Sequence, residues 1–184
     1  MAVRNLLMAL TNATGIKSVT HNESFGQASV QAEVVCTGHT LSIGDTVTLT
    51  LGYDDENQAF ITNGFVKSIT ARKPEFDYVI QVHDKLIKAV DYFMASDNPD
   101  SPFTASNISG EQLVTNLLAQ AGITGITTEA TGFTFATQTP TPINLISAWE
   151  AVENICRIVG FVCFVEPDGT VKFVSRKPYI VGGD

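Results

Sequence analysis

Three histidines are the residues in this sequence best suited to general acid–base chemistry or to metal binding. They are His21, His39 and His83, all in the first half of the chain, and no pair follows the HExxH spacing of a zinc-binding helix. A scattered histidine is more often an exposed or hydrogen-bonded structural residue than a ligand. We therefore expect no catalytic or metal-binding role for any of the three.

Three cysteines, Cys36, Cys156 and Cys163, could act as nucleophiles, metal ligands or disulfide partners. Their number is odd and no C-x-x-C pair occurs, so neither a disulfide framework nor a zinc site is indicated. Cys156 falls on the apolar stripe of an expected helix and Cys163 on an apolar strand, where a thiol serves as a small hydrophobic residue. The pattern predicts synthesis and folding in a reducing cytoplasm.

Two acidic clusters carry the oxygen atoms that calcium prefers. The first comprises Asp54, Asp55, Glu56 and Asn57, and the second comprises Asp97, Asn98, Pro99 and Asp100. Neither has the alternating ligands and central glycine of an EF-hand loop. Solvated loops explain both clusters better than a bound ion does.

The sequence motifs of the common nucleotide-binding and hydrolase sites do not occur. The chain contains no GxGxxG, GxxxxGKS/T or GxSxG. Its one tryptophan, Trp149, stands in the first turn of an expected helix and is interpreted as a core or interface anchor. With no catalytic, cofactor-binding or metal-binding residue identified and no cofactor implied, we expect a protein that is not an enzyme.

Composition narrows the function further. Eleven Lys and Arg against nineteen Asp and Glu give a net charge of −8, so no basic face for phosphates is expected and sequence-specific nucleic-acid binding is excluded. Hydrophobic residues make up 44% and charged residues 16%, which fits a well-filled core or, as we favour, a surface partly covered by partner subunits.

The apolar runs are too short for the ~20 residues of a membrane-spanning helix. The first fifteen residues lack the apolar core of a signal peptide and are expected to form an opening helix or strand.

Residues 1–92 alternate between apolar and polar side chains with the period of strands. Segments 25–36, 46–52, 59–71 and 76–83 each show it, and GYDDENQAF between two of them is typical of a hairpin loop. The residues expected on the apolar faces are Val30, Ala32, Val34, Val47, Leu49, Leu51, Phe76, Tyr78, Ile80 and Val82. Such strands predict an antiparallel β-barrel-like domain or a sandwich.

Residues 93–184 are predicted to form a mixed second lobe, which makes the fold class α+β. DKLIKAVDYF should form a short helix or turn at the boundary, ASDNPDSPF a loop, and residues 124–142 a strand or two and an extended linker. A C-terminal hairpin is expected, with strands 161–165 and 170–175 around Glu166-Pro167-Asp168-Gly169, because proline and glycine suit this turn.

Two helices of similar plan are predicted in the second lobe. The N-caps are Ser109 and Ser147, with Gln112 and Glu150 three residues later, and Ile108 and Leu113 can form a hydrophobic staple. The helices end at Gly122 and Gly160. Their apolar stripes are expected to be Leu113, Val114, Leu117, Leu118 and Ala121 in the first, and Val152, Ile155, Cys156 and Val159 in the second.

The order of these pieces resembles the central hub proteins of phage tails and baseplates, as in Mu-like phages, and the related hub domains of siphophage tail tips and type VI secretion spikes. The resemblance is carried by GDTVTLTLGYDDENQAFITNGFVKSI, then ISGEQLVTNLLAQAGI, then SAWEAVENICRIVGFVCFVEPDGTVKF, over roughly residues 40–177. Each motif consists of common residues, so the resemblance rests on the order and spacing of the motifs.

The resemblance implies a structural virion protein made in the host cytoplasm. Its implied role is a ring-forming hub, a homotrimer, that joins the tail tube or distal tail protein to a central spike or fibre, contacts a tape-measure protein and forms part of the channel for DNA ejection. Hubs of this kind continue into a second barrel-like domain, which a neighbouring protein would supply here unless this is a reduced hub. A tail-associated cell-wall-degrading enzyme and a host-surface binding module remain as alternatives.

Overall fold

The computed structural model describes residues 6–22, 28–53, 56–72, 77–94, 104–135, 141–142 and 145–176. The chain divides into two compact units. The first consists of Met1–Ile87 together with Val165–Thr170, and the second of Lys88–Phe164 together with Val171–Asp184. The described residues are mostly β and form three helices, none of which is long and apolar enough to cross a membrane.

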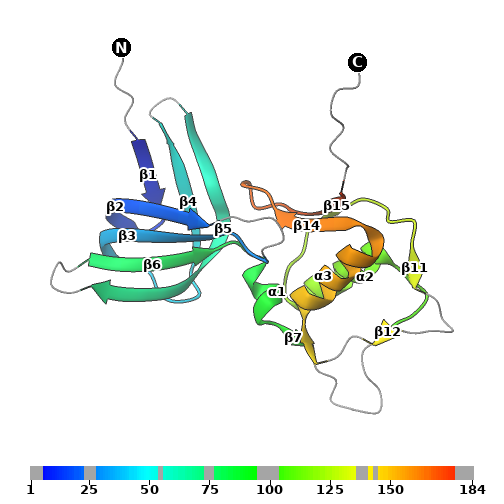
Figure 1. The fold of residues 1–184 in the computed structure, drawn as a ribbon. Coiled ribbons are helices and arrows are strands. Elements are labelled where there is room, and N and C mark those ends of the chain that lie inside the picture. The colour runs from blue at the N-terminus through cyan, green and yellow to red at the C-terminus, as the bar shows by residue number, and fades with distance from the viewer. Residues whose placement is uncertain are drawn as a thin grey trace, which may run out of the picture. The chain divides into compact units, whose positions relative to one another are not determined.

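The first unit is built on a six-stranded antiparallel sheet with the strand order β1-β4-β5-β6-β3-β2 (Figure 1). The strands are β1 (Leu6–Leu10), β2 (Ala13–Asn22), β3 (Gln31–His39), β4 (Thr46–Tyr53), β5 (Glu56–Arg72) and β6 (Asp77–His83). The sheet curls into a nearly closed barrel whose two edge strands, β1 and β2, follow one another in the chain. The expected antiparallel, barrel-like arrangement of strands is therefore confirmed.

Apolar and polar residues alternate along these strands, so the apolar side chains lie on one face of the sheet and form the core. Val47 and Leu49 on β4 are almost completely buried, as are Ile80 and Val82 on β6, and Leu51 is partly buried against the same core. Ala32 and Val34 of β3 join them, with Val30 and Tyr78 partly buried. The predicted apolar faces are confirmed, except for Phe76, which lies outside the described residues.

Strand bounds differ from the prediction at several points. The opening segment forms two strands, β1 and β2, where one helix or strand was expected. The strand expected at residues 25–36 begins only at Gln31, although residues 25–27 lie outside the described part, and β5 extends beyond 59–71 at both ends. The β4–β5 hairpin is confirmed, because Tyr53 pairs with Glu56.

The second unit carries the helices α1 (Ile87–Asp91, which starts at the boundary), α2 (Gly110–Gln120) and α3 (Ala148–Val159). Short paired strands surround them: β7 (Phe93–Met94), β8 (Thr104–Ala105), β9 (Ile108–Ser109), β11 (Thr134–Phe135), β12 (Thr141–Pro142) and β13 (Ile146–Ser147). A separate sheet has the order β10-β15-β14, from β10 (Thr127–Thr128), β14 (Phe161–Val165) and β15 (Val171–Ser175). The short helix near residue 90 and strands within 124–142 are thus confirmed, and the loop expected at 95–103 lies outside the described residues.

Both predicted N-caps are confirmed. Ser109 Oγ accepts a hydrogen bond from Gln112 N at 3.4 Å, and Ser147 Oγ accepts one from Glu150 N at 3.0 Å. Both serines are extended, as an N-cap requires. In a capping box the Gln112 side chain would return to the backbone N–H of Ser109, but here its amide nitrogen donates to Asn116 Oδ1 at 2.9 Å.

The apolar stripe of α2 is buried as predicted, whereas the buried face of α3 differs from the predicted one. On α2 all five expected residues are buried. On α3, Val152 and Ile155 are buried but Cys156 and Val159 are only half-buried. Ala148 and Ala151 are buried in addition, because the helix is rotated so that its small residues pack inward.

The C-terminal hairpin has the predicted turn. Gly169 N donates to Glu166 O at 2.8 Å and Glu166 N donates to Thr170 O at 2.9 Å. Gly169 has φ +85°, the left-handed conformation that favours glycine. The turn residues belong to the first unit, where a Cβ on Gly169 would lie 2.8 Å from the carbonyl oxygen of Thr62.

Candidate functional site

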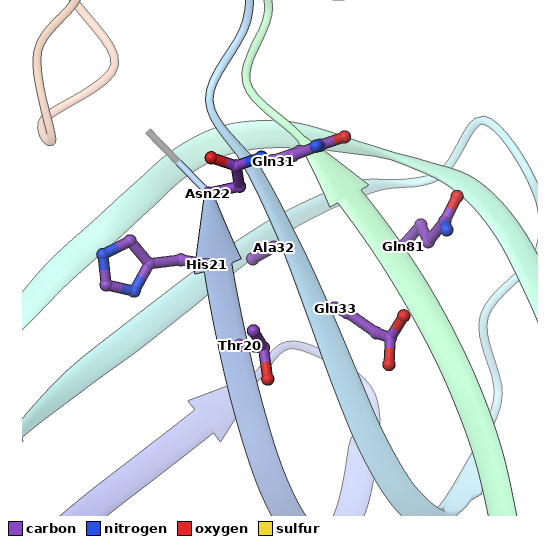
Figure 2. A pocket seen from close by; sticks show the side chains of 7 residues that line it. All are labelled: Thr20, His21, Asn22, Gln31, Ala32, Glu33 and Gln81. Carbon is purple, nitrogen blue, oxygen red and sulfur yellow. The ribbon is translucent and has the colours of Figure 1, made fainter. Parts of the chain in front are cut away.

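A polar groove of about 200 Å³ lies on the first unit, where β2, β3 and β6 run side by side (Figure 2). Seven residues line it: Thr20, His21, Asn22, Gln31, Ala32, Glu33 and Gln81. The ladder brings them together, since Glu33 pairs with Thr20 of β2 on one side and with Gln81 of β6 on the other. Side chains that pair in this way project from the same face of a sheet.

The groove can form hydrogen bonds but offers no acid–base pair. Glu33 is its one carboxylate, and Ser68 Oγ donates to Gln81 Oε1 at 2.9 Å beside it. His21 extends away from Glu33 and Gln81 (Figure 2), and its ring packs edge-on against Phe60 with centroids 4.8 Å apart. Sequence reasoning did not find this groove, because its residues come from strands whose register only the fold sets.

The three histidines are placed separately by the structure. His39 Nδ1 accepts from Leu41 N at 3.1 Å, and its ring packs edge-on against Tyr78. His83 Nδ1 lies 3.5 Å from Ser29 Oγ. Within the described part of the chain, no group of three or more His, Cys, Asp or Glu side chains is placed to hold a metal ion.

None of the three cysteines is joined in a disulfide. Cys163 is buried, as predicted for a small hydrophobic residue, whereas Cys156, for which the same was predicted, is only half-buried. Cys36 is buried as well. Desolvation by burial, with the charge of Glu153, raises the pKa of Cys156 to about 11, and burial also raises that of Cys36. A thiol with a raised pKa is a poor nucleophile, because the thiolate is the reactive form.

The remaining sequence candidates contribute little to a site. Trp149 is half-buried in the first turn of α3. Asp54 and Asp55 lie outside the described residues, as do the side chains of Glu56 and Asn57 and the whole of residues 97–100.

Two buried carboxylates were missed by the sequence reasoning. Asp77 is 4% exposed and accepts from Lys17 Nζ at 2.7 Å. Asp84, also 4% exposed, accepts from the backbone N of Val30 and of Leu86 at 2.8 and 2.9 Å, and burial raises its pKa. Both have structural partners, so we assign them to the fold and not to catalysis.

Exposed apolar side chains mark the surface of both units. Among the described residues the large ones are Leu7, Ile43, Tyr53, Tyr92, Phe93, Phe133, Leu145, Ile158 and Phe164. Single exposed apolar residues are ordinary, but neighbouring ones indicate contact with another protein.

Comparison with known proteins gives a fold and no sequence family. No protein-family model matches the chain, and no curated protein matches it at a significant level. Similar solved structures include a tail protein from Neisseria meningitidis (TM-score 0.64, 16% identity, 91% of this chain and 50% of that one) and the 43 kDa tail protein of prophage MuSo2 from Shewanella oneidensis (TM-score 0.62, 17% identity, 92% and 53%). The chain spans about half the length of these two proteins. The resemblance drawn from the sequence is confirmed at the level of fold: the chain shares the fold of phage tail proteins.

Proposed function

We propose that this chain is a structural protein of a phage tail, and specifically a ring-forming hub. The observation that carries the proposal is the fold shared with two phage tail proteins over 91% and 92% of the chain. In this role the chain forms a homotrimer, links the tail tube or distal tail protein to a central spike or fibre, and contacts the tape-measure protein. It is made in the host cytoplasm and ends in the virion.

The chemistry of the described residues supports a role without turnover. The three histidines have separate surroundings, Cys156 has a raised pKa, and the two buried carboxylates have backbone or lysine partners. The output of such a protein is the placement of neighbouring subunits.

The charge of the chain supports passage of DNA through the ring. A trimer carries three times −8, and an acidic bore repels phosphates at a range that salt limits to about 8 Å. DNA then moves through without being held by counterion release.

The test is to purify tails and locate the chain by cryo-electron microscopy, with native mass measurement of the isolated protein. We expect density at the distal end of the tail and a particle of three times 19.8 kDa. Purified protein should show no salt-sensitive DNA binding at low ionic strength. Absence of the chain from purified tails contradicts the structural role, and a basic bore contradicts the channel.

The polar groove is the one feature that favours a second role, a host-surface binding module. Its amides and hydroxyls suit a sugar, although the lining residues include no Phe, Tyr or Trp for a sugar ring to stack on. Binding of cell-surface polysaccharide that Glu33→Ala and Gln81→Ala abolish, without effect on tail assembly, would support that role.

A further inference from the structure

Glu33 is the one carboxylate in the polar groove, and the folded chain gives it no partner. It is half-buried, its side chain lies between those of Thr20 and Gln81 (Figure 2), and within the described residues it makes no hydrogen bond and no ion pair. The other buried or half-buried carboxylates whose side chains the structure describes each interact with another group of the chain: Asp45, Asp77, Asp84, Glu111, Glu129, Glu153 and Glu166. Among these residues Glu33 is therefore the exception.

The sheet itself does not need a carboxylate at this position. The residues that pair with Glu33 on the two neighbouring strands, Thr20 and Gln81, are uncharged. A half-buried charge loses part of its hydration, and without a partner nothing in the fold compensates that loss. A residue that is unfavourable for folding and has no compensating contact is often a functional one. The use of the Glu33 charge therefore lies outside the folded chain.

The size and lining of the groove limit what can enter it. Its volume of about 200 Å³ is below the ~300–1,000 Å³ of typical small-molecule pockets, so it suits one side chain of a partner better than a whole ligand. Among the described residues that line it there is no Lys or Arg, and all but Ala32 are polar. A matching group carries a positive charge and several hydrogen-bond donors.

We propose that the groove receives an arginine side chain of a neighbouring tail protein, whose guanidinium pairs with Glu33. A guanidinium is a planar fork of N–H donors, two of which match a carboxylate. The remaining donors suit the side-chain oxygens of Thr20, Asn22 and Gln31, which also line the groove. The ammonium of lysine has fewer donors and is more strongly hydrated, so it fits this lining less well. The inference rests on the tail role proposed above, which supplies the neighbour.

The net charge of the chain favours a partner of this kind. A charge of −8 attracts a basic neighbour and speeds its association. A single ion pair at the surface adds little affinity, but a half-buried one that is also hydrogen-bonded fixes the position and register of the partner. The groove therefore acts as a positioning contact within a larger interface.

The experiment is an NMR titration of the whole chain at low salt with Nα-acetylarginine amide. We expect saturable shifts confined to the groove, at Thr20, Glu33 and Gln81. The matched probe is Nα-acetylcitrulline amide, in which an uncharged urea replaces the guanidinium, and it should bind about tenfold or more weakly because the charge-assisted hydrogen bonds are lost. Added salt should weaken the binding of the arginine compound.

Glu33→Gln should abolish the saturable shifts and leave the melting temperature unchanged or higher, because it removes a charge that the fold does not compensate. The control is Glu150→Gln. Glu150 is an exposed carboxylate, and its side chain also has no partner within the described residues, so ordinary pairing with a surface charge would involve it equally. Removing it should leave the shifts in the groove unchanged.

Shifts that do not saturate, equal binding of the citrulline compound, or binding that survives in Glu33→Gln overturn the proposal. Saturable binding of methyl glucoside in place of the arginine compound overturns it too, and favours the host-surface role. An image of purified tails that shows the chain in place but no arginine of a neighbour at Glu33 overturns this inference alone. Absence of the chain from purified tails contradicts the proposed function itself.

Discussion

Lys17 Nζ lies 2.7 Å from Asp77 Oδ2, and the two residues stand on strands β2 and β6, with β3 between them in the sheet. The Asp77 side chain is 6% exposed, whereas that of Lys17 is 51% exposed. The other carboxylate oxygen, Oδ1, is buried without a hydrogen-bond partner. The lysine is therefore the main compensation for a buried charge.

Lys17→Met should destabilise the protein by about 1–3 kcal/mol, because it leaves a buried carboxylate without its partner. This range is below the usual loss for a fully buried pair, since solvent screens the half-exposed lysine. Urea denaturation measures the change. The control is Arg157→Met, which breaks the exposed Arg157–Glu153 pair and should cost about 0.5 kcal/mol or less. Equal losses of unfolding free energy for the two variants would contradict the claim that Lys17 compensates the buried carboxylate of Asp77.

Gly169→Val should cost more than about 1 kcal/mol, because a β-branched side chain resists positive φ. The nearby carbonyl of Thr62 adds a steric cost, since a Cβ would lie 2.8 Å from its oxygen. The matched control is Gly125→Val, where φ is also positive, at 71°, but nothing lies within 4 Å of a Cβ. Thermal unfolding should rank Gly169→Val as the more damaging variant, and the reverse order would show that the close approach is relaxed in solution.

Ser147→Ala should lower the free energy of unfolding by about 0.5–2 kcal/mol, the usual value of an N-cap. Ser109→Ala should cost less, because its hydrogen bond to Gln112 N is longer, 3.4 Å against 3.0 Å for Ser147. Ser18→Ala, at an exposed position on β2, serves as the control. If both cap variants behave like this control, the caps do not stabilise the helices.

The carboxylate of Glu111 predicts a loss of stability in acid. Hydrogen bonds from Thr131, from Oγ1 at 2.6 Å and from N at 3.1 Å, help lower its pKa to about 2, against about 4.3 in an unfolded chain. A lowered folded-state pKa gives stability that is fully present above the unfolded value and is lost as the pH falls from about 4.5 towards 2. A titration followed by NMR should show the low pKa directly. Urea denaturation at pH 7 and pH 3 should show a smaller pH effect for Glu111→Gln than for the wild type, and Glu153→Gln is the exposed control.

The thiols should react slowly in the folded protein. Cys36 and Cys163 are buried and the pKa of Cys156 is about 11, so little thiolate is available at neutral pH. Titration with a thiol reagent should count three thiols under denaturant and fewer in native buffer. A count of one under denaturant would reveal a disulfide.

Local signals made the capped helices and the C-terminal turn the more predictable elements. Each N-cap bond joins residues three apart, and the Pro-Asp-Gly turn closes through a bond from Gly169 to Glu166, so the chemistry of a few neighbouring residues determines them. The rotation of α3 was not predictable in this way. Ala148 and Ala151 became its buried face because small side chains permit close packing, which the apolar stripe did not reveal.

Strand β2 was missed for a physical reason. Its inward residues Ala13, Ile16 and Val19 recur every three positions, because Gly15 has φ 62° and the register shifts between Ile16 and Ser18. A spacing of three does not match the period of two by which strands are recognised.

The groove and the buried carboxylates depend on register between distant segments. Lys17 and Asp77 are 60 positions apart, and Val30 and Asp84 are 54 apart, so only the assembled sheet brings them together.

The assignment of the turn residues Val165–Thr170 to the first unit has a consequence for synthesis on the ribosome. The six strands of the barrel are complete in the nascent chain by His83, yet the last segment of that unit is translated more than eighty residues later. The amino-terminal unit therefore cannot reach its final form until nearly the whole chain has been translated. A protein released early, after the barrel strands but before the hairpin, would expose the surface around Thr62 that Gly169 normally covers. Nascent chains arrested before residue 165 should accordingly be cleaved by protease faster in this unit than chains arrested once the hairpin has left the ribosome.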